Sequence, residues 1–137
     1  MAQPMKLLLP AAIVLLLVLV VQTRGARPAA AAAASTRCAA SSVEVEQVNT
    51  GEKAGFDAVF EVTVRNRCGC AVRGVVLRSE GFASSAAVDP RLFRREGRRG
   101  YLVGDGRRIE SGAAVRFRYA WDRAFRMAPA AVHDDCT

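Results

Sequence analysis

The sequence contains a single histidine, His133, among its 137 residues. It stands beside Asp134 and Asp135 near the C-terminal end, where we interpret it as a solvated tail residue rather than the base of a catalytic triad. The other acidic residues stand alone or next to arginine, so their spacing nominates no pair of catalytic carboxylates. We therefore expect a protein that is not an enzyme and that binds no cofactor.

Lysine, aromatic residues and glycosylation signals are also scarce. Lys6 and Lys53 are the only lysines, and no Asn-X-Ser/Thr acceptor occurs, which excludes N-glycosylation. The chain has one Trp, two Tyr and six Phe. Five of them fall on the apolar phase of alternating segments and are predicted to pack in a core: Phe56, Phe60, Phe117, Tyr119 and Trp121. Few aromatic residues remain for stacking on a sugar.

One long apolar run is present, from Leu7 to Val21, and it is shorter than the roughly 20 residues that cross a bilayer. A polar start with Lys6 and a polar end at Gln22 to Arg24 complete the layout of a secretory signal. We predict a cleaved signal peptide, with an uncleaved signal anchor as the alternative, and no membrane span after cleavage. The expected organisation is a signal peptide over residues 1–26 (cleaved between 25 and 34), an Ala-rich flexible segment over 27–37 and one domain over 38–137.

Four cysteines lie after this run, at Cys38, Cys68, Cys70 and Cys136. An even number in a short exported chain predicts two disulfides. A bond between Cys68 and Cys70 would be strained, so each is expected to pair with Cys38 or Cys136, in either combination. A metal site is not expected, because one histidine and a single residue between Cys68 and Cys70 do not match zinc-ligand spacing.

Beyond Cys38 the apolar residues repeat with a period of two, and turn residues separate the segments. The pattern predicts an all-β fold, a small antiparallel β-sandwich stapled by two disulfides. The expected strands lie within 43–46, 56–65, 70–77, 86–88, 101–103, 115–121 and 130–132.

The formal net charge is +7, and arginine supplies nearly all of the positive charge. In an exported protein this charge points to acidic polysaccharide, anionic headgroups or an acidic receptor face rather than to nucleic acid. One segment concentrates it, with Arg91, Arg94, Arg95, Arg98, Arg99, Arg107 and Arg108. A hairpin with arms 101–103 and 107–109 would gather these arginines at one end of the domain. They would then either pair with carboxylates of a partner or form a solvated basic face.

Several strings occur in a specific order: Asn66-Arg67-Cys68-Gly69-Cys70, the run from Val88 to Arg95 (VDPRLFRR), Leu102 to Gly106 (LVGDG) and Phe117 to Asp122 (FRYAWD). With the flanking Cys38 and Cys136 they resemble the Tapetum Determinant-like family of plant secreted cysteine-rich proteins. The resemblance implies a ligand released to the apoplast and recognised by the ectodomain of a leucine-rich-repeat receptor kinase. It also implies a role in cell differentiation during anther and tapetum development. The residues nominated for receptor contact are Arg91, Phe93, Arg94, Arg95 and Asp105.

The family usually has six cysteines, and the two that are missing here would fall near Ser79 and at Tyr101. The resemblance implies a third bridge between those positions that this chain lacks. Its absence would free the arginine-rich segment between them, and a looser binding loop costs ordering entropy on association. A different class of function stays open: a non-catalytic module of the cell wall, whose basic face makes weak contacts with acidic polysaccharide.

Overall fold

The computed structural model describes residues 37–98 and 100–137. The predicted signal peptide and nearly all of the Ala-rich segment lie outside these residues. The described chain forms seven strands and two short 3₁₀ turns: η1 (Ala40–Ser42), β1 (Val43–Ala54), β2 (Asp57–Asn66), β3 (Ala71–Arg78), β4 (Phe93–Glu96), β5 (Gly100–Val103), η2 (Gly104–Gly106), β6 (Ala114–Trp121) and β7 (Ala128–Asp135).

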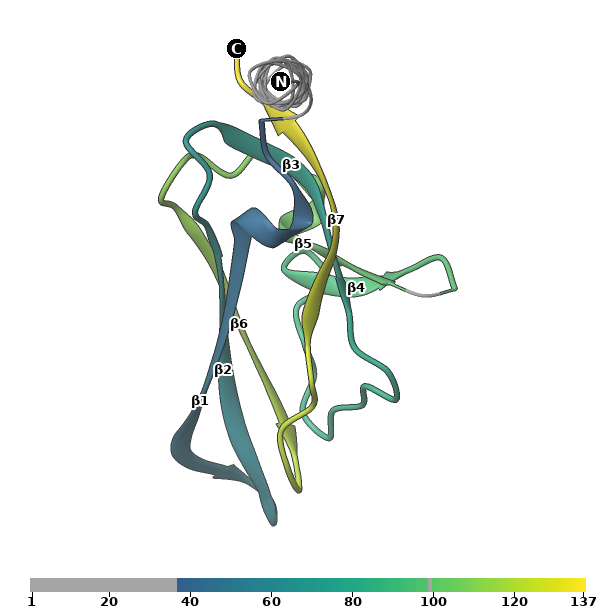
Figure 1. Ribbon diagram of the computed structural model, residues 1–137. Coiled ribbons are helices and arrows are strands. Elements are labelled where there is room, and N and C mark those ends of the chain that lie inside the picture. The colour runs from purple at the N-terminus through teal and green to yellow at the C-terminus, as the bar shows by residue number, and fades with distance from the viewer. Residues whose placement is uncertain (1–36, 99) are drawn as a thin grey trace, which may run out of the picture. The chain divides into compact units, whose positions relative to one another are not determined.

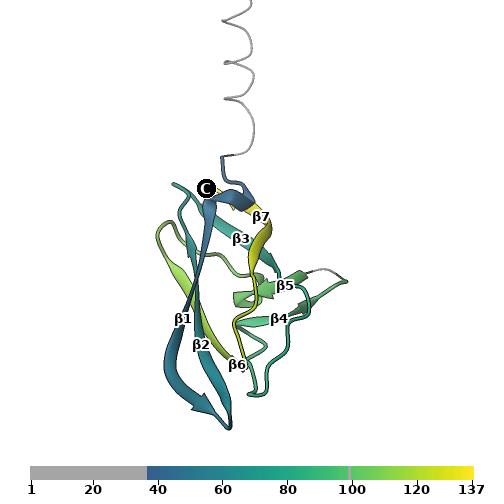
Figure 2. The same cartoon turned by 60° about the horizontal axis from the view of Figure 1, so that its bottom comes forward.

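The strands form two antiparallel sheets, one with the order β1-β2-β6 and the other with the order β4-β5-β3-β7. The sheets face each other across the core, as the views in Figures 1 and 2 show. The predicted fold class, a small antiparallel β-sandwich, is therefore confirmed. In the described part of the chain, no helix has the length and apolar character needed to cross a membrane.

The three-stranded sheet follows the alternation of its sequence. Phe60, Val62 and Val64 of β2 are buried, whereas the residues between them are partly exposed. Phe60 lies opposite Tyr119 of β6, and Val62 lies opposite Phe117, so the inward residues of both strands form one apolar layer. This is the arrangement expected when one face of a sheet meets a core and the other meets water.

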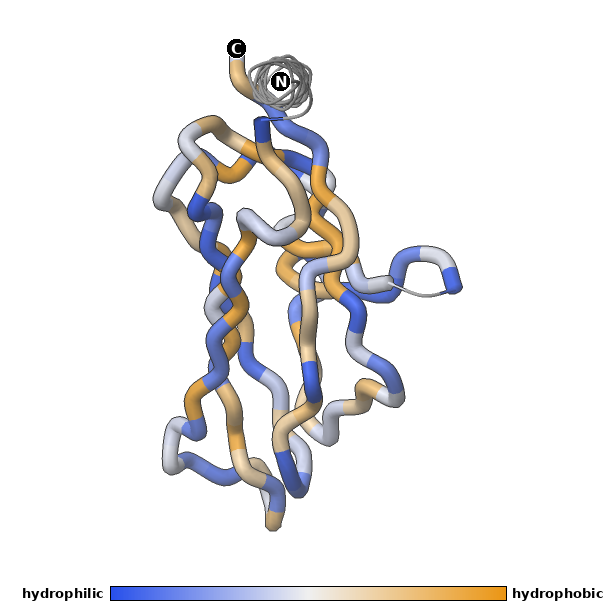
Figure 3. Tube along the Cα trace, in the orientation of Figure 1, coloured by the Kyte–Doolittle hydropathy of each residue, from blue (hydrophilic) through white to orange (hydrophobic). Residues whose placement is uncertain are grey.

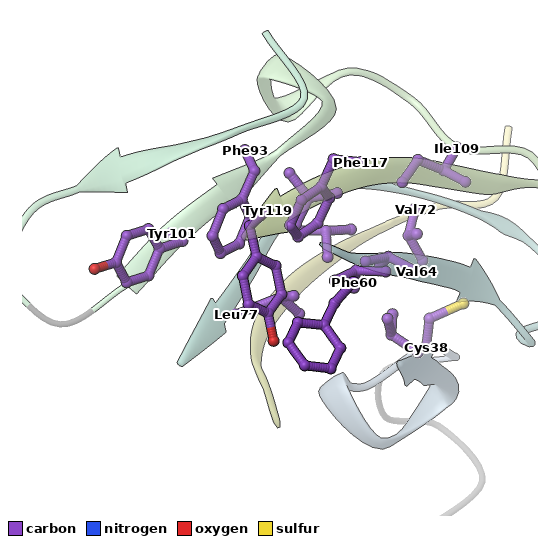
Figure 4. Packing of buried hydrophobic residues seen from close by; sticks show 14 residues of the cluster. Cys38, Phe60, Val64, Val72, Leu77, Phe93, Tyr101, Ile109, Phe117 and Tyr119 are labelled. Atoms are coloured by element: carbon purple, nitrogen blue, oxygen red, sulfur yellow. The ribbon is translucent and has the colours of Figure 1, made fainter. Parts of the chain in front are cut away.

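Strand β3 supplies the facing layer, and a glycine changes its phase. The pairing of β3 with β7 shifts between Arg73 and Val76, and Gly74 has a φ of 59°, which favours glycine. Because of this bulge, Val72 and Leu77 are both buried although they are five residues apart. Figure 4 shows the two among the packed side chains of the core.

The disulfides join Cys38 to Cys68 and Cys70 to Cys136. Each middle cysteine therefore reaches a terminal one, as predicted, and the structure decides between the two pairings that the sequence left open. Asn66 supports this region, because its buried side-chain amide donates hydrogen bonds to the carbonyl oxygens of Cys70 and Ile109. The short Cys68 to Cys70 segment thus anchors both ends of the domain.

Some expectations about strands were wrong. Residues 86–88 form no strand, and the arginine-rich hairpin consists of β4 and β5, not of 101–103 and 107–109. After β5 the chain instead turns at η2, and Ile109 pairs with Val72 in an isolated bridge. Apolar Ile109 is buried there, which a two-stranded hairpin projecting into water would not provide.

Two side chains also differ from expectation. Phe56 is fully exposed, because it lies in the turn between β1 and β2, before the buried alternation of β2 begins. His133 is exposed, but it belongs to β7 and pairs with Arg73 of β3 instead of lying in a frayed tail. The last residues of the domain are thus part of the sheet.

Candidate functional site

The arginine-rich hairpin of β4 and β5 is the most distinctive surface feature of the domain. Phe93 pairs with Val103 and Glu96 pairs with Gly100, and the turn between them passes through Gly97, whose φ is 67°. Figures 1 and 2 show the hairpin extending to one side, and Figure 3 shows that its outer end is hydrophilic. At Gly100 a side chain would collide with Val76, so glycine lets the base of the hairpin pack against β3.

Aromatic rings hold this base in place. The ring of Phe93 stacks on Phe117 at 4.2 Å and on Tyr101 at 4.8 Å between centroids. Phe82 meets Phe93 and Tyr101 edge to face. Phe93 is only 3% exposed, so it supports the surface from beneath and does not offer its ring to a partner. The other four nominated residues remain accessible.

Arg94 and Asp105 form the first part of the site. The guanidinium Nη1 of Arg94 donates to Oδ1 of Asp105 at 2.6 Å, and this interaction lowers the pKa of the Asp105 carboxyl. Asp105 has a φ of 59°, between Gly104 and Gly106, which also have positive φ. Because the ion pair connects β4 to this left-handed turn, it fixes the turn against the hairpin.

Arg91 lies beside the same turn. Its backbone N–H and side chain donate to Asp89, with an ion-pair distance of 3.1 Å, and these bonds lower the pKa of Asp89. A pocket of about 370 Å³ opens here. We call it the Asp105 pocket; its lining includes Asp89, Arg91, Leu92, Asp105, Arg107 and Arg108. Its charges are mixed: Asp89 pairs with Arg91 inside the lining, whereas Asp105 and Arg108 pair with residues outside it.

Arg95 follows Arg94 in β4 and takes part in a different pocket, because neighbouring residues of a strand point to opposite faces. Its guanidinium lies 5.8 Å from the centroid of the Tyr101 ring, donates to the Tyr101 hydroxyl at 3.3 Å and donates to the Arg98 carbonyl at 3.0 Å. A pocket of about 460 Å³ opens beside it. We call it the Arg95 pocket, lined by Arg78, Ser79, Glu80, Gly81, Arg95, Arg98 and Tyr101.

The structure thus divides the nominated residues into two groups. Arg91 and Asp105 line one pocket, and Arg94 is joined to it through its ion pair with Asp105. Arg95 lines the other pocket, and Phe93 is buried below. Arg108, another member of the arginine-rich segment, pairs instead with Glu110 and Asp135 and holds the last strand. The arginines that lie close together in the sequence therefore do not form one continuous basic face on the surface.

Arg78 and Ser79 are site residues that the sequence analysis did not nominate for binding. Arg78 ends the apolar strand β3, and Ser79 is 3% exposed, with a side-chain oxygen that lacks a hydrogen-bond partner. Only the family resemblance could have pointed to this region, because it implies two further cysteines near Ser79 and at Tyr101. In this chain both residues line the Arg95 pocket.

The sulfur atoms of Cys38, Cys70 and Cys136 lie within 4.8 Å of one another, a closeness that metal ligands also show. All three belong to disulfides, and a disulfide sulfur provides no thiolate for a metal. The cluster therefore acts as a covalent staple between the ends of the domain.

Comparison with known proteins extends the resemblance. Residues 39–136 match the family described as Tapetum determinant 1, C-terminal. The chain is 40% identical over 68 residues to TPD1 protein homolog 1A from Oryza sativa subsp. japonica, covering 44% of this chain and 30% of that relative. It is 33% identical over 96 residues to TPD1 protein homolog 1B from the same plant, covering 69% of this chain and 57% of that relative. No solved structure gives a significant match.

Proposed function

Because the chain belongs to the Tapetum determinant 1 C-terminal family, we propose that it is a secreted protein ligand of a plant leucine-rich-repeat receptor kinase, acting in cell-fate specification during anther development. The observation that carries this proposal is the extent of the match, which spans the disulfide-linked domain from residue 39 to 136. The chain covers 30% of the length of one relative and 57% of the length of the other. The receptor kinase as partner and the anther as the site of action are therefore proposed for this chain.

Release to the apoplast follows from two features that support each other. The apolar run from Leu7 to Val21 has the layout of a signal peptide, and the domain behind it closes two disulfides. Stable disulfides belong to oxidising compartments. We therefore assign the domain of residues 38–137 to the extracellular space, with the segment before it serving export.

The receptor-contact surface in this proposal is the β4–β5 hairpin with the turn that Asp105 occupies. Arg91 and Arg94 expose 81% and 38% of their side chains while their carboxylate partners hold them in place. A side chain that is ordered before binding loses less conformational entropy when a partner arrives. Phe93 contributes indirectly, by fixing the strand on which Arg94 and Arg95 stand.

The proposed function is tested by measuring binding of the purified, oxidised protein to leucine-rich-repeat receptor kinase ectodomains by biolayer interferometry. We expect saturable binding to at least one of them, and a loss of affinity of about tenfold or more when Arg94→Glu and Arg95→Glu are combined. Arg116→Glu with Arg123→Glu is the matched control, because it changes the same charge at exposed positions on other parts of the domain.

Equal losses in the two double variants would show that the contribution is long-range charge rather than contact at the hairpin. Absence of binding to any such ectodomain, with retention on pectin that disappears in moderate salt, would favour the wall-polysaccharide module instead. Inward-facing aromatic residues argue against that alternative, because Phe60, Phe117 and Tyr119 are buried and offer no stacking platform for sugars.

A further inference from the structure

We propose that the Arg95 pocket receives a carboxylate side chain from an acidic segment of a protein partner. This inference deepens the proposed function by naming the chemistry that one part of the hairpin recognises, and it rests on that function only for the identity of the partner. The nominated contact residues other than Arg95 are not needed for it.

The first observation is the positive charge of the Arg95 pocket, whose arginines are not paired with carboxylates of the described chain. Among the described residues, Arg78, Arg95 and Arg98 form no ion pair, although all three line this pocket. At the Asp105 pocket, by contrast, Arg91 and Arg108 are paired with carboxylates, and among the described residues Arg107 is the one arginine of its lining without an ion pair. Glu80 is the one acidic residue of the Arg95 pocket, so the lining keeps an excess of positive charge.

The guanidinium of Arg95 is also positioned in advance. Its two terminal nitrogens donate to the Tyr101 hydroxyl and to the Arg98 carbonyl, and its Cζ lies 5.8 Å from the centroid of the Tyr101 ring. Figure 4 shows the hydroxyl of Tyr101 turned away from the core side chains. A guanidinium held in this way can bind a carboxylate oxygen with little further loss of side-chain freedom.

Ser79 provides an independent observation. It is 3% exposed, it lines the pocket, and its hydroxyl is the one buried side-chain polar atom that lacks a hydrogen-bond partner within the described chain. Leaving such a group without a partner costs about 1–3 kcal/mol. An oxyanion held in the pocket, with the hydroxyl rotated towards it, would remove that cost.

The shape of the pocket favours a protein side chain over a polysaccharide. Tyr101 is the only aromatic residue of the lining, and it is 8% exposed because its ring is covered by Phe93 and Phe82. A sugar chain needs an exposed ring or an extended groove. A pocket of about 460 Å³ whose lining carries three arginines suits one or two carboxylate side chains.

The test is an NMR titration of the purified, oxidised, isotope-labelled protein with a peptide of three glutamates flanked by glycines and blocked at both ends. We expect saturable shifts at the amides of Ser79, Gly81 and Arg98. Combining Arg95→Ala with Arg98→Ala should weaken binding by about tenfold or more. Combining Arg123→Ala with Arg126→Ala, which removes the same charge from exposed positions outside the pocket, should change it less than about threefold.

Ser79→Ala is the second variant. It should weaken peptide binding without lowering the melting temperature, because it removes a hydroxyl that has no partner in the free protein. Shifts that do not saturate, or equal losses in the two double-arginine variants, would overturn the proposal. Trigalacturonate that binds this pocket while the peptide does not would also overturn it, in favour of a polysaccharide occupant.

A binding experiment with the receptor ectodomain distinguishes this inference from the proposed function. If peptide and receptor both bind, the peptide should compete with the receptor ectodomain for the wild-type protein. If no receptor ectodomain binds while the peptide titration succeeds, the pocket stands and the proposed function fails. If the receptor ectodomain still binds in the presence of saturating peptide, the pocket is not part of that interface. The carboxylate that the pocket receives would then not come from the receptor.

Discussion

Arg108 and Asp135 form an ion pair at 2.7 Å that joins the segment after β5 to the last residues of β7. Arg73 of β3 contacts the same carboxylate at 2.8 Å. Asp135 directly precedes Cys136, so two arginines and a disulfide hold the end of the chain at one place. The C-terminal strand is thereby tied into the four-stranded sheet.

This arrangement predicts an acid-sensitive contribution to stability. The hydrogen bonds from Arg108 and then Arg73 lower the pKa of Asp135 below its ordinary value of 3.8. A carboxyl with a lowered pKa in the folded state stabilises the protein above its unfolded pKa, and this stabilisation is lost as the pH falls through the folded value. Asp135→Asn should therefore lower the melting temperature at neutral pH, and its difference from wild type should shrink below about pH 4. Melting curves between pH 2 and 7 measure this.

The control for that measurement is Asp122→Asn, since Asp122 is exposed and makes no ion pair within the described chain. It should leave the melting temperature almost unchanged at every pH. A constant difference between Asp135→Asn and wild type across the whole range would contradict the assignment of the effect to the charge of Asp135.

The left-handed turn at Asp105 predicts a graded response to substitution. Asp105→Val should destabilise the domain by about 1–3 kcal/mol, because a β-branched residue is strained at positive φ. Asp105→Asn keeps a residue that tolerates this conformation and removes the charge of the ion pair with Arg94, so its loss should be much smaller. Chemical denaturation of the two variants gives the comparison, and equal losses would mean that the conformation of residue 105 does not matter.

The two disulfides should differ in their effect on stability. Removing the Cys70–Cys136 bridge, which spans 66 residues, should cost about 4 kcal/mol in the chain-entropy model. The Cys38–Cys68 bridge spans 30 residues, and its loss should cost somewhat less. Paired Cys→Ala variants, compared by urea denaturation, measure both. The fully reduced and alkylated protein should lose its cooperative transition, and an unchanged melting curve would refute the importance of the bridges.

Two phenylalanines four residues apart provide a test of the β1–β2 hairpin. Phe60→Ala should destabilise the domain by about 3–5 kcal/mol, because Phe60 is buried against Tyr119. Phe56→Ala should change stability by less than about 0.5 kcal/mol, because Phe56 is fully exposed in the turn. The free energy of unfolding of each variant decides the matter; a large loss at Phe56 would place this residue in the core.

Much of the fold could be predicted because its signals are local. Alternation over Phe60 to Val64 and over Phe117 to Trp121 reports which face of each strand is buried. The bulge at Gly74 and the bridge between Val72 and Ile109 could not be predicted, because each depends on a partner far along the chain. The short strand β4 could not be predicted either. Phe93 is its single buried residue, and the two arginines that follow it leave no alternating pattern in the sequence.

The candidate site was predictable only in part. The segment from Val88 to Arg95 drew attention through its arginines and its match to a family, and Arg94 and Asp105 do meet. That Arg94 pairs with Asp105 while Arg95 lines a separate pocket follows from the pairing of β4 with β5, a hairpin that was expected elsewhere in the sequence. Ser79 drew attention only through the family resemblance, since its missing hydrogen bond exists only in the folded chain.

By itself, the sequence determined the β-sandwich class, the presence of two bridges and the family, because residue periodicity, cysteine number and motif order are properties of the chain alone. Tertiary structure decided that Cys38 pairs with Cys68 and Cys70 with Cys136. It also decided which arginines are neutralised and which remain available to a partner. The reason is that disulfides and ion pairs act over a few ångströms, and only the packing of the two sheets brings distant residues that close.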